Sequence, residues 1–246
     1  MNEPRPGSRL LDLVAIMDRL RSPGGCPWDA RQTHTSLLRY LVEESYEVVE
    51  AVEGGDREEL RDELGDLLLQ VVFHARVAAE DPREGFDIDD VADAIVTKLE
   101  RRHPHVFAGE AVAEDLQQRW DAIKAVEKPR ESVLDGIPLA LPALARADKV
   151  LGRLQRNGLV TPAQAPAEIP AQTPTPTQTQ AVAGVEAEPA MATGGDEVSV
   201  GEALLALVGH ARAAGVDPEA ALRVATRRLE TQARAVERAR REGVPA

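Results

Sequence analysis

Several features that define other protein classes are scarce or missing in this 246-residue sequence. Cys26 is the one cysteine, so the chain cannot form an internal disulfide, a composition typical of a reducing compartment. No apolar run approaches the length that spans a membrane, and the first ten residues contain no apolar signal core. We therefore expect a soluble, cytoplasmic protein.

Basic charge is also in short supply. The 29 Lys and Arg residues are outnumbered by 42 Asp and Glu residues, which gives a formal net charge of −13. Such a surface repels nucleic acids and anionic membranes, so we expect neither as the main partner. An anionic substrate would need a metal ion, or Lys and Arg side chains placed locally around it.

The residues that are abundant favour helices. The chain is 43% hydrophobic but only 3% aromatic, and no segment shows the alternating pattern of a strand. Asp56, with Glu59 three residues later, resembles a capping box at the start of a helix. Apolar periodicity and Gly or Pro breaks predict helices over residues 9–21, 33–52, 56–80, 89–102 and 111–127, a partly helical segment at 137–158 and further helices within 199–243, with HPHVFAGE as a break. The fold class that we expect is all-α.

Composition divides the chain into four parts. Residues 1–130 hold the long amphipathic helices and are expected to form one domain, and residues 131–160 are an apolar, partly helical segment between domains. Residues 161–198 contain no Lys or Arg and are rich in Pro, Thr, Gln and Ala, which predicts a disordered linker. Residues 199–246 return to a helical pattern, including a basic amphipathic helix.

Four carboxylates stand among apolar residues as two pairs spaced three apart, Glu44 with Glu47 and Glu63 with Asp66. Residues three or four apart share a helix face, and the short turn between these two helices predicts that they pack antiparallel, so the pairs can converge. Converging carboxylates repel one another unless a cation is present, and Mg²⁺ suits oxygen ligands. A solvated acidic face is the alternative, and spacing alone weighs the two about equally.

Four linked motifs resemble the MazG family of all-α nucleoside triphosphate pyrophosphohydrolases. They are CPWDARQTHTSLLRYLVEESYEVVEAV, LRDELGDLLLQVVFHARVA, KLERRHPHVF and RWDAIKAVEK, within residues 9–128. The family signature E-E-x-x-E followed by E-x-x-D is met by Glu43, Glu44 and Glu47 and by Glu63 and Asp66. The resemblance covers about half of the chain, and the linked set is more specific than any one motif.

The resemblance implies a reaction and a set of residues for it. The expected reaction is hydrolysis between the α- and β-phosphates, which yields a nucleoside monophosphate and pyrophosphate, in a MazG-like helical bundle that forms a homodimer. The implied Mg²⁺ ligands are Glu44, Glu47, Glu63 and Asp66, with Glu43 as a further ligand or water activator. Mn²⁺ is the implied substitute for Mg²⁺. The implied substrate contacts are Lys98 and Arg102 for phosphate oxygens, and Trp120 and Lys124 for the base or ribose.

Two rival functions stay open. A related fold hydrolyses phosphoribosyl-ATP or selected pyrimidine deoxynucleotides, although the match through RRHPHVF and RWDAIKAVEK favours MazG. A non-catalytic helical module that binds a nucleotide or a protein is the alternative from a different class. Such a module would keep its function without Glu44 or Asp66, whereas an enzyme would lose it.

The region after residue 136 resembles a second MazG copy that has lost its acids. The family's inter-domain segment is matched by IPLALPALARADKVLGRLQRNG, but the Pro/Thr/Gln tract stands where an E-E-x-x-E helix is expected. Ser199 and Glu202 occupy the positions of the E-x-x-D pair, and Thr231 stands where an Arg is expected. We expect no second metal site here, and a role in packing or dimerisation instead.

Some aromatic residues carry weaker signals. Trp28 follows the first predicted helix, where it would either wedge two helices together or stack on a base, the wedge being favoured. His103 and His105 flank Pro104 and suggest helix capping or ligand contact. His34 and His74 are interpreted as packing residues.

Overall fold

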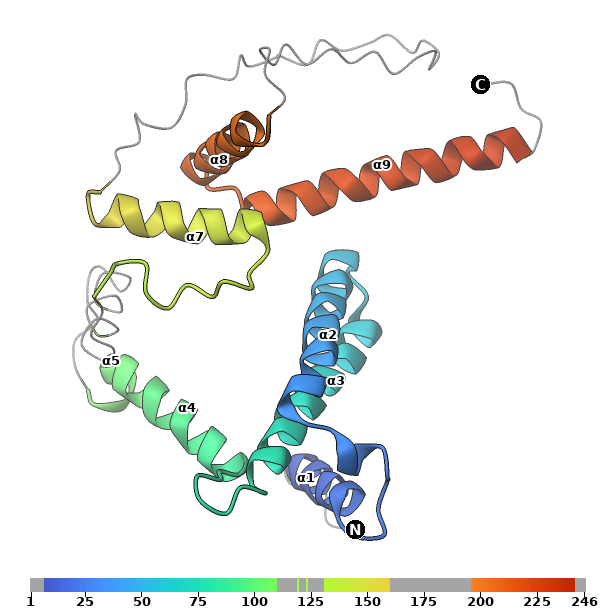
Figure 1. The fold of residues 1–246 in the computed structure, drawn as a ribbon, viewed down its shortest axis with the longest axis vertical. Coiled ribbons are helices and arrows are strands. Elements are labelled where there is room, and N and C mark those ends of the chain that lie inside the picture. The colour runs from blue at the N-terminus through green and yellow to red at the C-terminus, as the bar shows by residue number, and fades with distance from the viewer. Residues whose placement is uncertain (1–6, 110–118, 120–122, 124–130, 160–195, 242–246) are drawn as a thin grey trace. The chain divides into compact units, whose positions relative to one another are not determined.

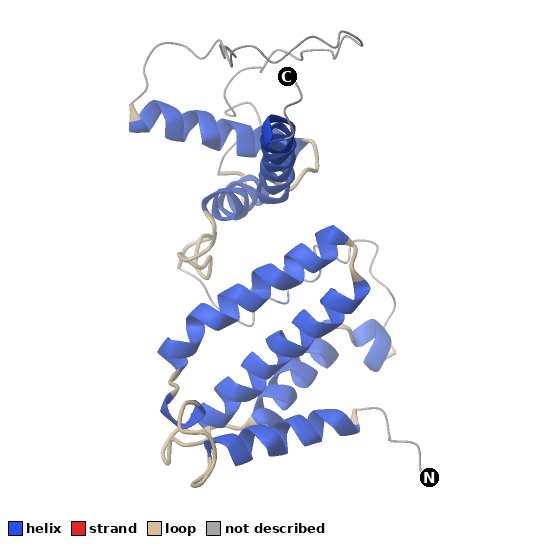
Figure 2. Cartoon of the chain, turned by 90° about the vertical axis from the view of Figure 1, so that its right-hand side faces the viewer, coloured by secondary structure: helices blue, strands red, loops and turns tan. Residues whose placement is uncertain are grey.

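A computed structural model describes residues 7–109, 119, 123, 131–159 and 196–241 of the chain. Every regular element in these ranges is a helix, and none of the described residues belongs to a strand (Figure 2), which confirms the all-α prediction. The chain divides into two compact units, Met1–Lys124 and Ala125–Ala246. None of the described helices combines the length and the apolar character needed to cross a membrane.

The helices follow the predicted order closely (Figure 1). In the first unit they are α1 (Ser8–Arg21), the 3₁₀ turn η1 (Asp29–Arg31), α2 (His34–Gly54), α3 (Arg57–Ala78), α4 (Ile88–Arg102) and α5 (Pro104–Phe107), and in the second unit α7 (Ala143–Arg156), α8 (Glu197–Ala213) and α9 (Pro218–Arg241). Helix α8 begins two residues inside the predicted linker, most of which lies outside the described residues. The helix predicted at 111–127 also lies outside them, apart from Arg119 and Ile123, which are helical.

Side-chain caps set the starts of the helices that carry the candidate site. Asp56 accepts hydrogen bonds from the backbone N–H groups of Glu58 and Glu59, so it caps α3 as predicted. Thr33 caps α2 in a reciprocal capping box with Ser36. Between them, Gly55 ends α2 with a φ of 75°, a conformation that glycine adopts without strain. The resulting short turn makes α2 and α3 antiparallel neighbours.

The predicted break at HPHVFAGE is partly wrong. Helix α4 ends at Arg102, but Pro104 starts the one-turn helix α5 at its first position, where a proline loses no hydrogen bond. Nδ1 of His103 lies 2.7 Å from the carbonyl oxygen of Leu99, so this imidazole caps the end of α4. Of the two predicted roles for the histidines around Pro104, capping is the one that His103 shows.

The core of the first unit lies where α1 crosses the α2–α3 pair. Met17, Leu37, Val72 and Phe73 form its buried centre. Next to them the guanidinium of Arg21, with 4% of the side chain exposed, donates to both carboxylate oxygens of Glu80, at 2.9 and 2.7 Å. Arg21 also donates to the carbonyl oxygens of Asp29 and Gln32. It therefore ties α1 to the end of α3 and to the loop that leads into α2.

The second unit packs α7 against α8 and α9. Gly152 of α7 lies directly against the guanidinium of Arg212, and a Cβ on this glycine would come within 2.4 Å of that group. Arg212 donates to Asp148 at 2.8 Å and to Gln155 at 2.9 Å. The glycine thus allows a close approach at which an arginine of α8 is held by two side chains of α7.

Candidate metal centre and substrate site

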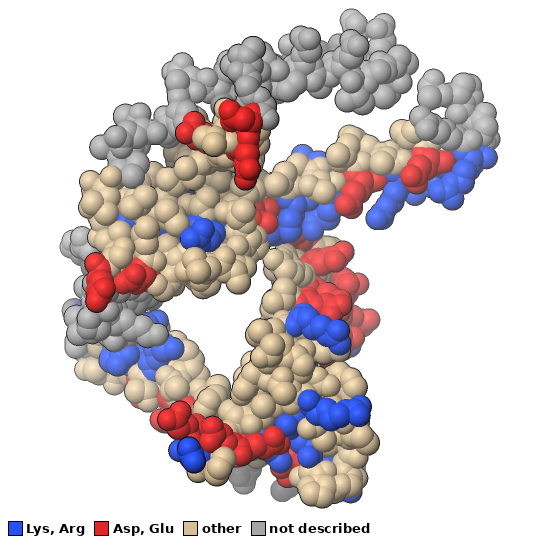
Figure 3. Space-filling view, viewed as in Figure 1, with Lys and Arg blue, Asp and Glu red and all other residues tan. Residues whose placement is uncertain are grey.

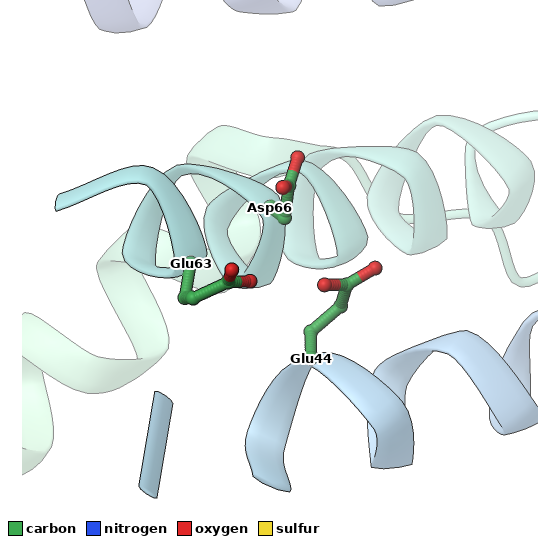
Figure 4. Close-up of side chains that lie close together, drawn as sticks. All are labelled: Glu44, Glu63 and Asp66. Atoms are coloured by element: carbon green, nitrogen blue, oxygen red, sulfur yellow. The ribbon is translucent and has the colours of Figure 1, made fainter. Parts of the chain in front are cut away.

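Three carboxylates from two helices converge on one point. Glu44 projects from α2 and Glu63 and Asp66 from α3, and one oxygen from each of the three lies within 4.8 Å of the others. Figure 4 shows Glu44 extending from α2 toward α3, on which Glu63 and Asp66 lie about one turn apart. The convergence follows from the sequence because residues 63 and 66 share a face of α3 and the short turn brings that face onto α2.

The environment of the cluster disfavours its charged state. Burial raises the pKa of Glu44 to about 7, and a hydrogen bond to Glu47 and the charges of Asp66, Glu47 and Glu63 act in the same direction. Desolvation also raises the pKa of Glu63, followed by the charges of Glu47 and Asp66. Each carboxylate therefore makes ionisation of the others more costly.

No Lys or Arg in the described part of the chain forms an ion pair with Glu44, Glu63 or Asp66. Acidic side chains also gather around the end of α2 and the start of α3, in the upper part of this helix pair in Figure 3. Oxygen-only donors from carboxylates are the set that hard divalent cations such as Mg²⁺ prefer. The residues present therefore fit a divalent metal ion.

The remaining predicted acids lie beside this group. Glu47 is half-buried on α2 and hydrogen-bonds Glu44, but it is not one of the three whose oxygens converge. Glu43 is exposed on α2, and no described interaction joins it to the cluster. The roles assigned to these two residues stay predictions.

The predicted substrate residues are only partly described. Lys98 is exposed and Arg102 half-buried on α4, one turn apart. No described contact joins either side chain to the acidic cluster. Trp120 and Lys124 lie outside the described residues.

Two contacts between ring side chains lie near the start of α2. His34 and His74, interpreted as packing residues, face each other with their Nδ1 atoms 2.8 Å apart. Trp28 is 44% exposed and meets Tyr40 edge-on, with ring centroids 5.9 Å apart. The contact between the two histidines could have been predicted from the antiparallel arrangement of α2 and α3. In such a helix pair, the numbers of two facing residues have a nearly constant sum.

Comparisons with known proteins identify the family. Residues 32–107 match the MazG nucleotide pyrophosphohydrolase domain. The chain is 40% identical over 233 residues to a nucleoside triphosphate pyrophosphohydrolase of Escherichia coli, covering 92% of this chain and 86% of the relative. This chain belongs to the MazG family.

Other MazG relatives cover different shares of the chain. The nucleoside triphosphate pyrophosphohydrolase of Mycolicibacterium smegmatis is 54% identical over 161 residues, which is 64% of this chain but 49% of the relative. This chain thus spans about half the length of that relative. An uncharacterised protein of Streptomyces cacaoi is 47% identical over 236 residues, 94% of this chain and 84% of the relative.

Proposed function

We propose that this MazG chain is a nucleoside triphosphate pyrophosphohydrolase that depends on a divalent cation. The observation that carries the proposal is the convergence of Glu44, Glu63 and Asp66 within 4.8 Å, with no described cation to neutralise them. The names of the Escherichia coli and Mycolicibacterium smegmatis relatives support the same activity. Water adds to the α-phosphorus, the bond to the β-phosphate breaks, and the products are a nucleoside monophosphate and pyrophosphate.

Glu44, Glu63 and Asp66, with Glu47 beside them, would hold Mg²⁺, which when bound neutralises phosphate charge and lowers the pKa of a coordinated water. Mn²⁺, which accepts the same oxygen ligands, would substitute for it. Glu43 is exposed and is not part of the converging group, so in our proposal its carboxylate is available to accept the proton of the attacking water.

The basic residues would act on the phosphates. Lys98 and Arg102 share one face of α4, where an ammonium and a guanidinium can both donate to phosphate oxygens. In the proposal they stabilise the negative charge that gathers on the departing pyrophosphate. Trp120 and Lys124 are proposed to contact the base and ribose.

We also propose that the enzyme is a cytoplasmic homodimer. The first unit leaves many apolar side chains exposed on the helices around the site: Leu38, Val42 and Tyr46 on α2, Leu64, Leu68 and Val71 on α3, and Ile95, Val96 and Leu99 on α4. Apolar exposure on this scale favours burial against a second protein surface. Sedimentation equilibrium of the full chain tests this, and a monomer at micromolar concentration would refute it.

The activity is tested by pyrophosphate release from a panel of ribo- and deoxynucleoside triphosphates. The wild type, Glu44→Ala and the matched control Glu50→Ala, an exposed acid of the same helix, are each assayed with Mg²⁺, Mn²⁺ or EDTA. We expect release by the wild type and the control with either metal, and none with EDTA or from Glu44→Ala. A wild type that binds nucleotides without releasing pyrophosphate would instead indicate a non-catalytic module.

A further inference from the structure

The imidazoles of His34 and His74 make an unusual contact between α2 and α3. His34 is the first residue of α2, and its Nδ1 lies 2.8 Å from Nδ1 of His74, which is on α3. The rings are nearly parallel, at 10°, with centroids 5.1 Å apart. Two nitrogens at this distance share one proton, so one ring donates an N–H and the other accepts it.

A second observation concerns the other nitrogen of His74. Nε2 of His74 and Oε1 of Gln70 are both buried, and neither atom has a hydrogen-bond partner among the described residues. Gln70 is 6% exposed and lies one turn before His74 on the same face of α3. An amide oxygen can only accept, whereas Nε2 donates or accepts according to the tautomer. Among the described residues, the contact with Nδ1 of His34 is therefore the one hydrogen bond that holds the ring of His74.

The same helix pair holds the acidic cluster. On α2, His34, Leu37 and Glu44 fall on one face, and on α3 Glu63, Gln70 and His74 do so. The ten residues from His34 to Glu44 amount to about 15 Å of helix. Repulsion among Glu44, Glu63 and Asp66 drives α2 and α3 apart at one point, whereas the imidazole contact holds them together at the other.

We propose that His34 and His74 are positioning residues that hold α2 against α3 through this contact, and so pre-set the spacing of the carboxylates for a divalent cation. This inference rests on the proposed metal-dependent function. Without the contact, a metal ion would also have to restore the register of the two helices, and its affinity would fall.

The device also predicts a response to pH. The contact needs one Nδ1 without a proton, and protonation of both Nδ1 atoms puts two N–H groups face to face. Burial, and then the charge of His34, lowers the pKa of His74 below its usual 6.5, so the contact opens only at more acidic pH.

Other charged groups on the surrounding elements are engaged elsewhere. Arg76 binds Asp18 and Glu80, Arg21 binds Glu80 and two carbonyl oxygens, and Arg39 lies on the ring of Tyr40. Asp29 and Arg31 belong to η1, which precedes α2. None of these groups has a described hydrogen bond or ion pair with either imidazole.

The contact is tested by ¹⁵N NMR of the imidazole rings in the full chain at pH 8. We expect one of the two Nδ1 atoms, and not both, to carry a proton, because one ring donates and the other accepts. Two protonated or two unprotonated Nδ1 atoms in the wild type would overturn the proposed contact.

Positioning is tested by calorimetric titration of Mg²⁺ alone at pH 8, which needs no turnover. His34→Ala is expected to bind Mg²⁺ about threefold to tenfold more weakly, the effect of one net hydrogen bond. His34→Asn keeps a side chain that can donate to Nδ1 of His74 or accept from it, and should stay within about twofold of the wild type, as should the neighbouring control Thr35→Ala. Wild-type affinity in a folded His34→Ala protein would refute the inference.

The two proposals fail in different ways. A wild type that binds Mg²⁺ and has one protonated Nδ1 in the contact but releases no pyrophosphate would refute the proposed activity alone. Unchanged Mg²⁺ affinity in His34→Ala, with activity present, would refute the positioning role alone. A wild type that binds no Mg²⁺ would refute both.

Discussion

The two units differ in how some of their acidic side chains are compensated. In the second unit, Asp148 pairs with Arg212 at 2.8 Å, and Asp196 and Asp217 accept backbone N–H groups at the starts of α8 and α9. In the first unit, the carboxylates of the converging cluster meet one another and no described cation. The number of acidic residues in a unit therefore does not indicate a metal site. The informative feature is which carboxylates the fold leaves without a positive charge or a hydrogen-bond donor to compensate them.

The comparison also bears on the prediction that the second unit is a MazG copy without a metal site. Ser199, where an acid is expected in such a copy, lies in the first turn of α8, and its backbone N–H is bound by the capping Asp196. Glu202, at the other expected acidic position, is exposed on the same helix. Nothing in the described part of this unit resembles the converging group of α2 and α3.

The largest expected effect separates the two units by activity. Glu44→Gln replaces a carboxylate of the cluster with a neutral amide of the same shape, and we expect pyrophosphate release to fall about 100-fold or more, because metal stabilisation of the transition state is worth several kcal/mol. The control is Glu50→Gln, on the exposed face of α2. Equal activity in both variants would remove the cluster from the mechanism.

A second difference concerns the arginine that holds each unit together. Arg21→Met is expected to destabilise α1–α3 by about 2–3 kcal/mol, because two carbonyl oxygens and Glu80 lose their donor in a buried place. Arg212→Met should cost the second unit about 1 kcal/mol, since its side chain is 26% exposed and water can replace it.

Native-state hydrogen exchange measures the stability of each unit separately and checks both expected losses of stability. Arg9→Met is the control, because its ion pair with Asp12 is on the surface and the side chain is 88% exposed. Equal losses of protection for Arg21→Met and Arg9→Met would show that burial of the guanidinium does not matter.

The pH dependence follows from Glu44. Its pKa of about 7 in the metal-free protein lies above the ordinary 4.5, so the folded state holds a proton that the unfolded state has lost between these values. This contribution to stability is complete below pH 4.5 and disappears as pH rises through about 7. Mg²⁺ must displace the same proton, so its affinity should fall by about tenfold per pH unit below the pKa.

Calorimetric titration of Mg²⁺ between pH 5.5 and 8.5, paired with thermal unfolding of the metal-free protein, measures both trends. In Glu44→Gln the proton is absent, and the rise of metal-free stability toward acid pH should shrink. A wild-type Mg²⁺ affinity that is flat across this range would contradict the raised pKa of Glu44.

The smallest expected effect belongs to the second unit. Glu202→Gln and Asp148→Asn should leave pyrophosphate release within about twofold of the wild type, because neither acid has converging neighbours. The same assay used for Glu44→Gln provides the comparison. A large loss in Glu202→Gln would show that the second unit takes part in catalysis.

Helix positions were predictable because their signals are local. Asp56 caps the helix that follows it, and Gly55 ends the one before, so the prediction and the structure differ by only a few residues there. At Pro104 the prediction failed in part, because the rule that proline stops a helix does not exclude a new helix that begins with it.

The candidate site was predictable only in part. Glu44, Glu63 and Asp66 converge as their spacing and the short turn required. Glu43 and Glu47 share a helix with Glu44, but spacing along one helix cannot say which of three adjacent acids turns toward the partner helix. That depends on the rotation of α2 against α3, which packing of the core sets.

The sequence by itself determined the all-α class, the order of the helices and the acids that could meet, because periodicity, caps and turns act over a few residues. Only the tertiary structure decided the contact of His34 with His74, forty residues away along the chain, and the burial that raises the pKa of Glu44. Both depend on how α2 and α3 pack, and packing is a property of surfaces that come together only when the chain folds.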